Sequence, residues 1–288
     1  MTKTKTLRID HVKHPMGLLS VHVFWCVAFI VIPLLFILYY MMIDGNGSLT
    51  LDNIKYLGSK EILRCFGRSL IYAAASTAVC LLLGYPLALI ISRMPTRRQT
   101  TMNMLIMIPM WVSFIIRTYT IKNIFNDNGI INQLLRSMHI LEKEGDFVKF
   151  LGTPGLIIFG MVYNFLPYMV VPIVTSLTGI DNRLFEASAD LGASPWKTLL
   201  HVTLPLSRAG IISGITMVFV PAVSTFYISS TLSGGTVTLI GDKIETAFLN
   251  ESNFSRGSAL SFVLMILIII SMLIMNKFGD RNVEGVAV

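Results

Sequence analysis

Six long apolar stretches constrain what this chain can fold into more than any other feature of its sequence. A helix needs roughly 20 mostly apolar residues to cross a hydrocarbon core about 30 Å thick. The stretches lie near residues 18–43, 69–92, 102–121, 155–177, 209–231 and 259–277. One such run could be the core helix of a soluble protein, but six of them predict transmembrane helices. We therefore expect an all-α membrane protein with a single domain over residues 1–288.

The composition agrees with a chain that lives in a bilayer. Of 288 residues, 53% are hydrophobic and only 14% are charged, and the mean hydropathy is +0.69. Soluble domains carry about 25% charged residues. The basic N-terminal segment could begin a secretory signal, but the apolar run from Leu18 to Met42 is too long for one and no small-x-small cleavage site follows it. We interpret this run as a retained first span.

Basic residues indicate how the chain is oriented. Cytoplasmic segments carry an excess of Lys and Arg, and short loops count most. The short connection RMPTRRQ, residues 93–99, and the basic tail with Lys277 and Arg281 favour a cytoplasmic N-terminus, although the counts on the two sides are almost equal. The net charge of +7 then reflects ordinary membrane-protein basicity. Lipid is an expected partner, and nothing indicates nucleic acid.

Motifs for chemistry are mostly missing. The chain has no G-x-x-x-x-G-K-[ST] sequence, so we expect no ATP bound through a P-loop, and it has no H-E-x-x-H metal motif. Of the five histidines only His22 lies in a span, and Cys26, Cys65 and Cys80 are not placed to form a disulfide framework. We expect no catalytic residues, no metal site and no cofactor in this chain.

Two classes of function, an ion-driven transporter and a membrane-embedded enzyme, can be weighed at this point. An ion-driven secondary transporter would need acidic residues at membrane depth, and none of the six stretches has one there. A membrane-embedded enzyme would need a nucleophile paired with a base, for which only His22 is available. Both are less favoured than a transport subunit that takes its energy from another chain.

Prolines inside the spans predict an irregular bundle. Each removes a backbone donor and tends to kink its helix, which is tolerated at membrane depth beside neighbours or a cavity. Simple packing irregularity would explain any single one. The prolines are Pro33, Pro86, Pro109, Pro167, Pro172 and Pro221. Together they favour helices that move or line a cavity.

The connection between the fourth and fifth spans is unusually polar for this chain. In EASADLGASPWKTLLHVTLP, Gly192 can take the left-handed conformation that ends a helix, and Ser194 followed by Pro195 is a start signal for a second. Pro205 is expected to stop that second helix. A DNA-binding helix-turn-helix tethered between spans could hardly reach DNA, and a plain interfacial linker is the simpler alternative. The pattern predicts two short helices joined at Gly192.

This stretch resembles the EAA loop of permease subunits of ABC importers, whose usual form is E-A-A-x-x-x-G-x(9)-I-x-L-P. Ser188 and Val202 depart mildly from that form. The residues that match are Glu186, Ala187, Gly192, Leu204 and Pro205, and with Ser188 they form the expected coupling loop. The resemblance implies a type I (MetI-like) permease fold in which the cytoplasmic loop, residues 182–207, docks a coupling helix on an ATPase subunit.

Further segments resemble the spermidine/putrescine permease subgroup of that family, including LGYPLALIISRMP, VYNFLPYMVVPI and FVPAVSTFYISSTLSGG. The resemblance implies a multi-pass protein of the bacterial inner membrane that forms half of a translocation pathway. It implies as partners a second homologous permease chain, two ATPase subunits that bind ATP and Mg²⁺, and an extracytoplasmic binding protein. In such a pair this chain resembles the first permease.

Aromatic side chains are the candidates for a polyamine pathway, because their faces attract ammonium groups. The candidates are Trp111, Tyr119, Tyr163, Tyr168, Phe226 and Tyr227. A kink at Pro167 could turn Tyr163 and Tyr168 towards one cavity, although each could equally be an interfacial or packing residue. Arg117 would oppose a cation unless Asp127, Asp242 or a backbone carbonyl holds it. Another small solute, such as an inorganic anion, a sulfur compound or ferric ion, is the alternative substrate.

Overall fold

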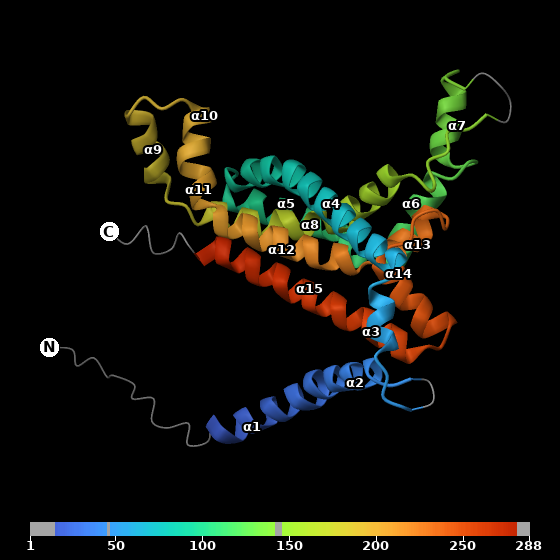
Figure 1. Cartoon of the computed structure of the whole chain (residues 1–288). Helices are drawn as coiled ribbons and strands as arrows, with labels where there is room; N and C mark the ends of the chain where they lie inside the picture. Colours follow the sequence, from blue (N-terminus) through green and yellow to red (C-terminus); the bar gives the residue numbers. More distant parts are fainter. Residues whose placement is uncertain (1–14, 45–46, 142–145, 281–288) are drawn as a thin grey trace.

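The structure is a computed structural model that describes residues 15–44, 47–141 and 146–280 (Figure 1). Some basic residues used above to orient the chain lie outside these ranges, namely Lys3, Lys5, Arg8, Lys13, Lys143 and Arg281. The described residues form helices and no strand, apart from one isolated bridge between Ile43 and Leu49.

The elements, of which η1 to η3 are π-helical, are α1 (Pro15–Cys26), η1 (Val27–Val31), α2 (Ile32–Met41), α3 (Asp52–Leu57), α4 (Lys60–Ser92), α5 (Thr96–Trp111), α6 (Phe114–Ile124), α7 (Ile130–Ser137), α8 (Pro154–Thr178), α9 (Asn182–Asp190), α10 (Pro195–Thr198), η2 (Leu199–Thr203), α11 (Leu204–Leu206), α12 (Arg208–Ser224), α13 (Tyr227–Ser233), α14 (Ile240–Glu245), η3 (Thr246–Asn250) and α15 (Phe254–Asp280).

The centre of the molecule is a bundle of α4, α8 and α12, which pack on one another. Small residues let α8 and α12 approach closely. A Cβ added to Gly214 would lie 2.8 Å from Met169 Sδ, and one added to Gly210 would lie 2.7 Å from the Pro172 carbonyl oxygen. Helices in lipid associate through such close van der Waals contact, because lipid is as apolar as the side chains themselves. The Gly210-x-x-x-Gly214 pair therefore positions α12 against α8.

The first span lies at the edge of this bundle. The chain from α1 through η1 to α2 is helical without a break, and α2 contacts α15. In the most apolar 18 residues of the segment His22–Met41 no residue is buried, whereas 61% of the corresponding window of α8 is. An apolar helix with so much free surface suits contact with lipid or with another subunit.

Two of the expected spans are broken helices. The α5 and α6 axes meet at 83° after Trp111, inside the expected span 102–121, and α12 ends at Ser224, inside the expected span 209–231. Pro109 and Pro221 lie within one turn of these breaks, as their missing backbone donors would allow. The fourth span shows that a proline need not break a helix, since α8 continues through Pro167 and Pro172.

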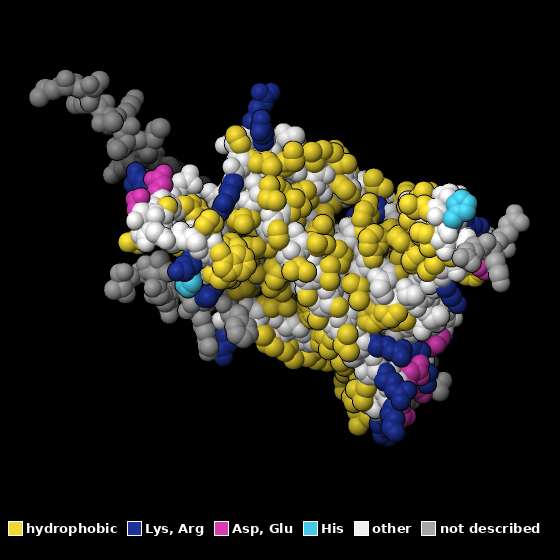
Figure 2. Space-filling view, turned by 90° about the horizontal axis from the view of Figure 1, so that it is seen from above, with side chains coloured by type: hydrophobic (Ala, Val, Ile, Leu, Met, Phe, Trp, Pro, Cys, Tyr) yellow, Lys and Arg dark blue, Asp and Glu magenta, His cyan; other side chains and the backbone are white. Residues whose placement is uncertain are grey.

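By length and hydropathy, four helices can each cross a membrane, and up to six spans result if each bent pair is one. The four single helices are His22–Met41, Lys60–Ser92, Pro154–Thr178 and Phe254–Lys277. The bent pairs are α5 with α6 and the segment Pro195–Leu206 with α12, which meet at 66°. Figure 2 shows hydrophobic side chains over the body of the molecule and charged ones gathered at its two ends. This distribution fits a bundle that spans a bilayer.

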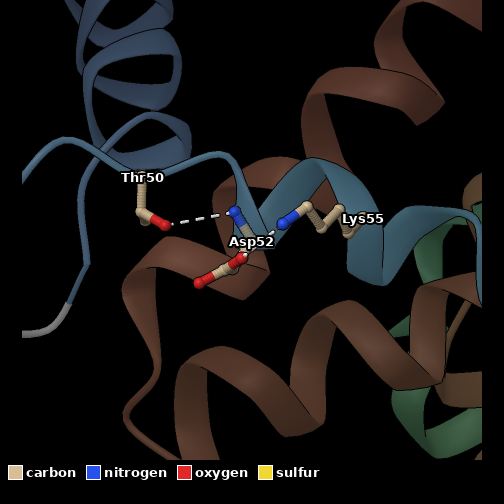
Figure 3. Close-up of polar contacts among 3 residues, drawn as sticks. All are labelled: Thr50, Asp52 and Lys55. Atoms are coloured by element: carbon tan, nitrogen blue, oxygen red, sulfur yellow. Dashed lines mark hydrogen bonds and ion pairs between the residues drawn. The ribbon is translucent and has the colours of Figure 1, made fainter.

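Local contacts fix the end of the bundle where α2, α3 and α15 meet. Asn53 is buried, and its Nδ2 donates to the carbonyl oxygens of Met41 and Ile43 at 3.1 and 3.0 Å, which satisfies the end of α2. At the start of α3, the Asp52 N–H donates to Thr50 Oγ1 at 3.1 Å, and Lys55 Nζ lies 3.3 Å from Asp52 Oδ1 (Figure 3). Both charged side chains are exposed, so this ion pair adds little stability.

A buried carboxyl organises the lobe between the fifth and sixth spans. Asp242 is 8% exposed, and its Oδ1 and Oδ2 accept hydrogen bonds from Ser229 Oγ and the Leu239 N–H, both at 2.7 Å. Ser69 of α4 accepts from the next amide, that of Ile240, at 2.8 Å. Burial raises the pKa of Asp242 to about 6 from 3.8, although the two hydrogen bonds act in the opposite direction.

We predict that this lobe is more stable in mild acid. Because the pKa of Asp242 is higher in the folded state, its stabilising contribution is full below about pH 4, falls as the pH rises through about 6, and is flat above. A pKa difference of about two corresponds to roughly 3 kcal/mol. Hydrogen exchange at the Leu239 and Ile240 amides, corrected for intrinsic rates, should show greater protection at about pH 4.5 than at about pH 7.5.

The variant Asp242→Asn should remove most of this difference, because the amide is close in shape but does not titrate. Asp52→Asn is the matched control, since Lys55 lowers the pKa of Asp52 and places its titration below the range tested. Equal pH dependence in the wild type and in Asp242→Asn would contradict the prediction.

Candidate functional site

The loop between the fourth and fifth spans forms a separate projection at one end of the bundle. In Figure 1, α9, α10 and α11 extend away from α8 and α12, at the end opposite α7, α13 and α14. Asp181 caps α9, because its Oδ1 accepts from the Arg183 N–H at 2.9 Å. Tyr85 of α4 contacts the far end of the loop through a 3.2 Å hydrogen bond to Ser207 Oγ.

The expected junction at Gly192 is present, and we call it the hinge. Gly192 has φ +72°, and its N–H donates to the Ala189 carbonyl at 2.8 Å. The next amide, of Ala193, donates to the Ser188 carbonyl at 3.1 Å, so the two bonds close the end of α9. No atom lies within 4 Å of a Cβ placed on Gly192. Its backbone conformation, and not lack of space, is therefore what calls for glycine.

The second helix starts where expected but ends later. Ser194 Oγ accepts from the Lys197 N–H at 3.4 Å with Pro195 in the first turn. The helix continues through η2 and α11 to Leu206, one residue past Pro205, and a 66° bend then leads into α12. The π-helical turn, in which the Leu204 N–H donates to the Leu199 carbonyl, widens the helix just before the proline.

A hydroxyl pair joins the two arms of the loop. Ser188 Oγ lies 2.8 Å from Thr198 Oγ1, and Ser188 is buried. The serine that replaces the second alanine of the usual motif thus has a partner across the hinge. Glu186 and Ala187 are exposed, and the Glu186 carboxylate makes no hydrogen bond or ion pair with the described part of the chain. These two residues remain available to a partner.

Sequence reasoning missed the exposed apolar side chains of this loop. Leu191 is 88% exposed and Trp196 is 67% exposed, on either side of the hinge. Exposed aromatic and aliphatic side chains on a polar projection are candidates for contact with another protein. The available signal was their position next to Gly192 in an otherwise polar segment. We define Leu191, Trp196 and Glu186 as the tip of the loop.

A cavity of about 660 Å³ separates the loop from the α4–α5 connection. The loop contributes Phe185, Ala189 and Thr198 to its lining, and the connection contributes Arg93 and Gln99. Gln99 Nε2 donates to the carbonyl oxygens of Ser92 and Met94, both at 2.8 Å, which holds the turn of the connection. The loop and the start of α5 therefore face each other across this cavity.

The aromatic pathway candidates divide between several surroundings. Tyr163 lines a cavity of about 420 Å³ together with Arg117, whereas Tyr168 lines another, of about 620 Å³, with Pro167 and Met217. The expectation that both tyrosines face one cavity is therefore not met. One turn and a half separates them on α8, which does not kink enough at Pro167 to bring them together.

A row of rings connects two of these candidates. Tyr227 lies 6.2 Å from Phe114, Phe114 lies 6.4 Å from Phe165, and Phe165 lies 6.5 Å from Tyr168, measured between ring centroids. The linking residues Phe114 and Phe165 were not expected from the sequence, because only the packing of α6 on α8 and α13 brings them there.

The other four candidates, Tyr163 among them, are not part of this row. Phe226 lines a cavity of about 530 Å³ that also contains Glu245 and Phe248. Trp111 and Tyr119 are 82% and 53% exposed, at the bend and on α6. Neither lines the cavities described above.

Arg117 does not have the partners that the sequence offered. It is 8% exposed, yet its Nε and Nη1 have no hydrogen-bond acceptor among the described residues. Asp242 is bonded to Ser229 and Leu239 instead, and Asp127 makes no ion pair with Arg117. Within the described ranges, no group of three or more His, Cys, Asp or Glu is arranged to hold a metal ion.

Comparison with known proteins agrees with this geometry. Residues 81–284 match the family described as binding-protein-dependent transport system inner membrane component. The chain is 34% identical to the spermidine/putrescine transport system permease protein PotB of Haemophilus influenzae, over 90% of this chain and 93% of that one. It is 32% identical to PotB of Escherichia coli, over 87% and 92% of the two chains.

A solved structure shares the fold. A crystal structure of a bacterial ABC transporter that imports the acidic polysaccharide alginate superposes with a TM-score of 0.78 at 17% identity, over 92% of this chain and 94% of that one. The chain is thus a transport component and not an enzyme. It belongs to the family of inner membrane permease components of binding-protein-dependent ABC transport systems.

Proposed function

We propose that this chain forms half of the translocation pathway of an ATP-driven polyamine importer. The loop carries the proposal, because its two helices are hinged at Gly192 and present Leu191 and Trp196 outside the bundle. A partner that grips this tip can transmit movement to α8 and α12, to which the two ends of the loop are connected. The 34% identical PotB protein supports the same reading.

The proposed assembly contains chains that this one requires. Two ATPase subunits bind ATP and Mg²⁺, since this sequence has no P-loop. A second homologous permease supplies the other half of the pathway, and an extracytoplasmic binding protein delivers the substrate. The ATPase subunits are cytoplasmic, so the loop that docks on them is cytoplasmic too. Four spans separate this loop from the N-terminus, and an even number puts the N-terminus on the same, cytoplasmic side.

The proposed substrate is spermidine or putrescine. The names of the curated relatives support this, and the row from Tyr168 to Tyr227 offers aromatic faces to ammonium groups. No span places an acidic residue at membrane depth to hold a cation tightly, which suits a transporter whose binding protein selects the substrate. Uptake of an inorganic anion, a sulfur compound or ferric ion in place of polyamine would overturn this part.

The coupling role of the loop predicts that Gly192→Pro abolishes ATP-driven uptake while the chain still inserts. Proline cannot adopt φ +72° and removes the N–H that bonds to Ala189, so the end of α9 must rearrange. Polyamine uptake and ATPase co-purification should both be measured on the membrane-inserted variant. Normal coupled uptake would contradict the assignment.

Gly47→Pro is a closely matched control. Gly47 has φ +79°, its N–H donates to the Asp44 carbonyl at 2.9 Å, and no atom lies within 4 Å of an added Cβ. It lies between α2 and α3, at the end of the molecule opposite the loop. Replacing glycine by proline at this position should leave the ATPase subunits bound.

We predict that the purified chain alone neither hydrolyses ATP nor transports polyamine in liposomes. Its sequence lacks the phosphate-binding motif, and half of a pathway is expected to come from a second permease. Adding the ATPase subunits, the second permease and the binding protein should restore uptake. ATP-dependent uptake by the single chain would refute the multi-subunit reading.

The aromatic pathway predicts that Tyr163→Leu and Tyr227→Leu lower uptake while ATPase activity persists. Leucine removes the ring face and hydroxyl but keeps an apolar side chain in place. Loss of one desolvated cation–π contact of about 2 kcal/mol weakens a bound state by roughly thirtyfold. Uptake should be normalised to assembled transporter, so that poor assembly is not mistaken for lost transport.

Tyr39→Leu provides the matched control for both variants. Tyr39 is an exposed tyrosine of α2 that lines none of the described cavities. If all three variants transport like the wild type, Tyr163 and Tyr227 are packing residues.

A further inference from the structure

Arg117 is a buried cation without a counter-ion in the described part of the chain. Its side chain is 8% exposed, and Nε and Nη1 are buried without a hydrogen-bond acceptor. The nearest favourable feature is the Phe114 ring, whose centroid lies 6.0 Å from Cζ. A buried guanidinium is costly unless it is paired and hydrogen-bonded. Among the described residues nothing supplies this pairing, so the site calls for a further anionic group.

The cavity beside Arg117 indicates what that group is attached to. It has a volume of about 420 Å³ and lies where α5, α6 and α8 meet. Thr120 and Tyr163 contribute hydroxyl groups to the lining. The remaining lining is apolar and consists of Pro109, Val112, Ile121, Ile124, Phe125 and Phe159. One fixed cation and two hydroxyl groups at a mainly apolar cavity suit a ligand with one anionic group and a hydrocarbon part.

The residues around the site are of types found at the membrane–water interface. Arg117 follows the 83° bend and lies on α6, at the end of the bundle opposite the loop (Figure 1). Trp111 and Tyr119 are exposed on either side of it, and these residue types are enriched at the membrane–water interface. Lys122 Nζ lies 6.0 Å from the Tyr119 ring centroid, and Lys122 does not line the cavity.

We propose that this cavity binds a phospholipid, with its phosphate on Arg117 and one acyl chain along the apolar lining. The guanidinium fork matches the oxygens of a phosphate and can bond to two of them. The acyl chain accounts for the apolar lining, which a free anion or a single carboxylate from a partner protein would leave unfilled. The inference does not depend on which solute is transported.

The first test uses the full wild-type chain, purified in detergent and stripped of lipid. Its thermal stability is measured with dioleoylphosphatidylglycerol, with dioleoylglycerol and with inorganic phosphate. Only the phospholipid has both the phosphate and the acyl chains, so it should stabilise at concentrations at least about tenfold lower than either fragment. Equal stabilisation by dioleoylglycerol would exclude phosphate recognition, and equal stabilisation by inorganic phosphate would indicate a free-anion site. Either result overturns the proposal.

The second test compares variants by native mass spectrometry of lipid adducts. Arg117→Gln should bind dioleoylphosphatidylglycerol at least about tenfold more weakly, and Arg117→Lys should lie between it and the wild type. Lys122→Gln is the matched control, because it removes a cation of the same helix that does not line the cavity. Unchanged lipid adducts in Arg117→Gln, with loss of a partner permease, would assign the guanidinium to a protein carboxylate. If Arg117→Gln does not fold, the wild-type series with the three ligands decides.

Discussion

The close approach of α8 and α12 is the contact on which the rest of the structure depends. In a bilayer, an apolar side chain gains little free energy by exchanging lipid contacts for contacts with another helix. Helices therefore associate where their backbones can approach closely. Gly210 and Gly214 give α12 that access to Met169 and Pro172 of α8. Gly84 of α4 meets the same Met169, whose Cγ would lie 3.1 Å from an added Cβ. One methionine of α8 thus forms the meeting point of three spans, and both ends of the loop are fixed relative to it.

The irregular ends of the third and fifth spans determine where chemistry can occur. The chain bends by 83° after Trp111, α12 ends at Ser224, and the short helices α6 and α13 pack on each other and on α8. The contact between Phe114 and Tyr227 joins the two broken ends. The breaks therefore create both the aromatic row and the cavity at Arg117.

Local signals were readable from the sequence, and tertiary ones were not. The hinge at Gly192 and the cap at Ser194 follow from one or two residues, and the structure has both. Whether a proline ends a helix depends on whether neighbouring groups satisfy the backbone carbonyl that it leaves unpaired. Pro109 and Pro167 look alike in sequence. In the structure Pro109 lies beside a break, whereas Pro167 lies inside an unbroken helix. The partners of Phe114 and the lack of one for Arg117 depend on packing between distant segments, which periodicity does not encode.

Charge balance links the lipid site to transport of a cation. Asp242, the buried acid at this end of the molecule, is already held by Ser229 and Leu239, and it does not compensate Arg117. A bare guanidinium beside Tyr163 would repel an approaching ammonium group, and the low dielectric of the interior would strengthen that repulsion. A phosphate on Arg117 cancels the positive charge without adding an acidic side chain that would trap a polycation. The aromatic faces can then interact with the substrate weakly and in succession, as a conduit driven by ATP requires.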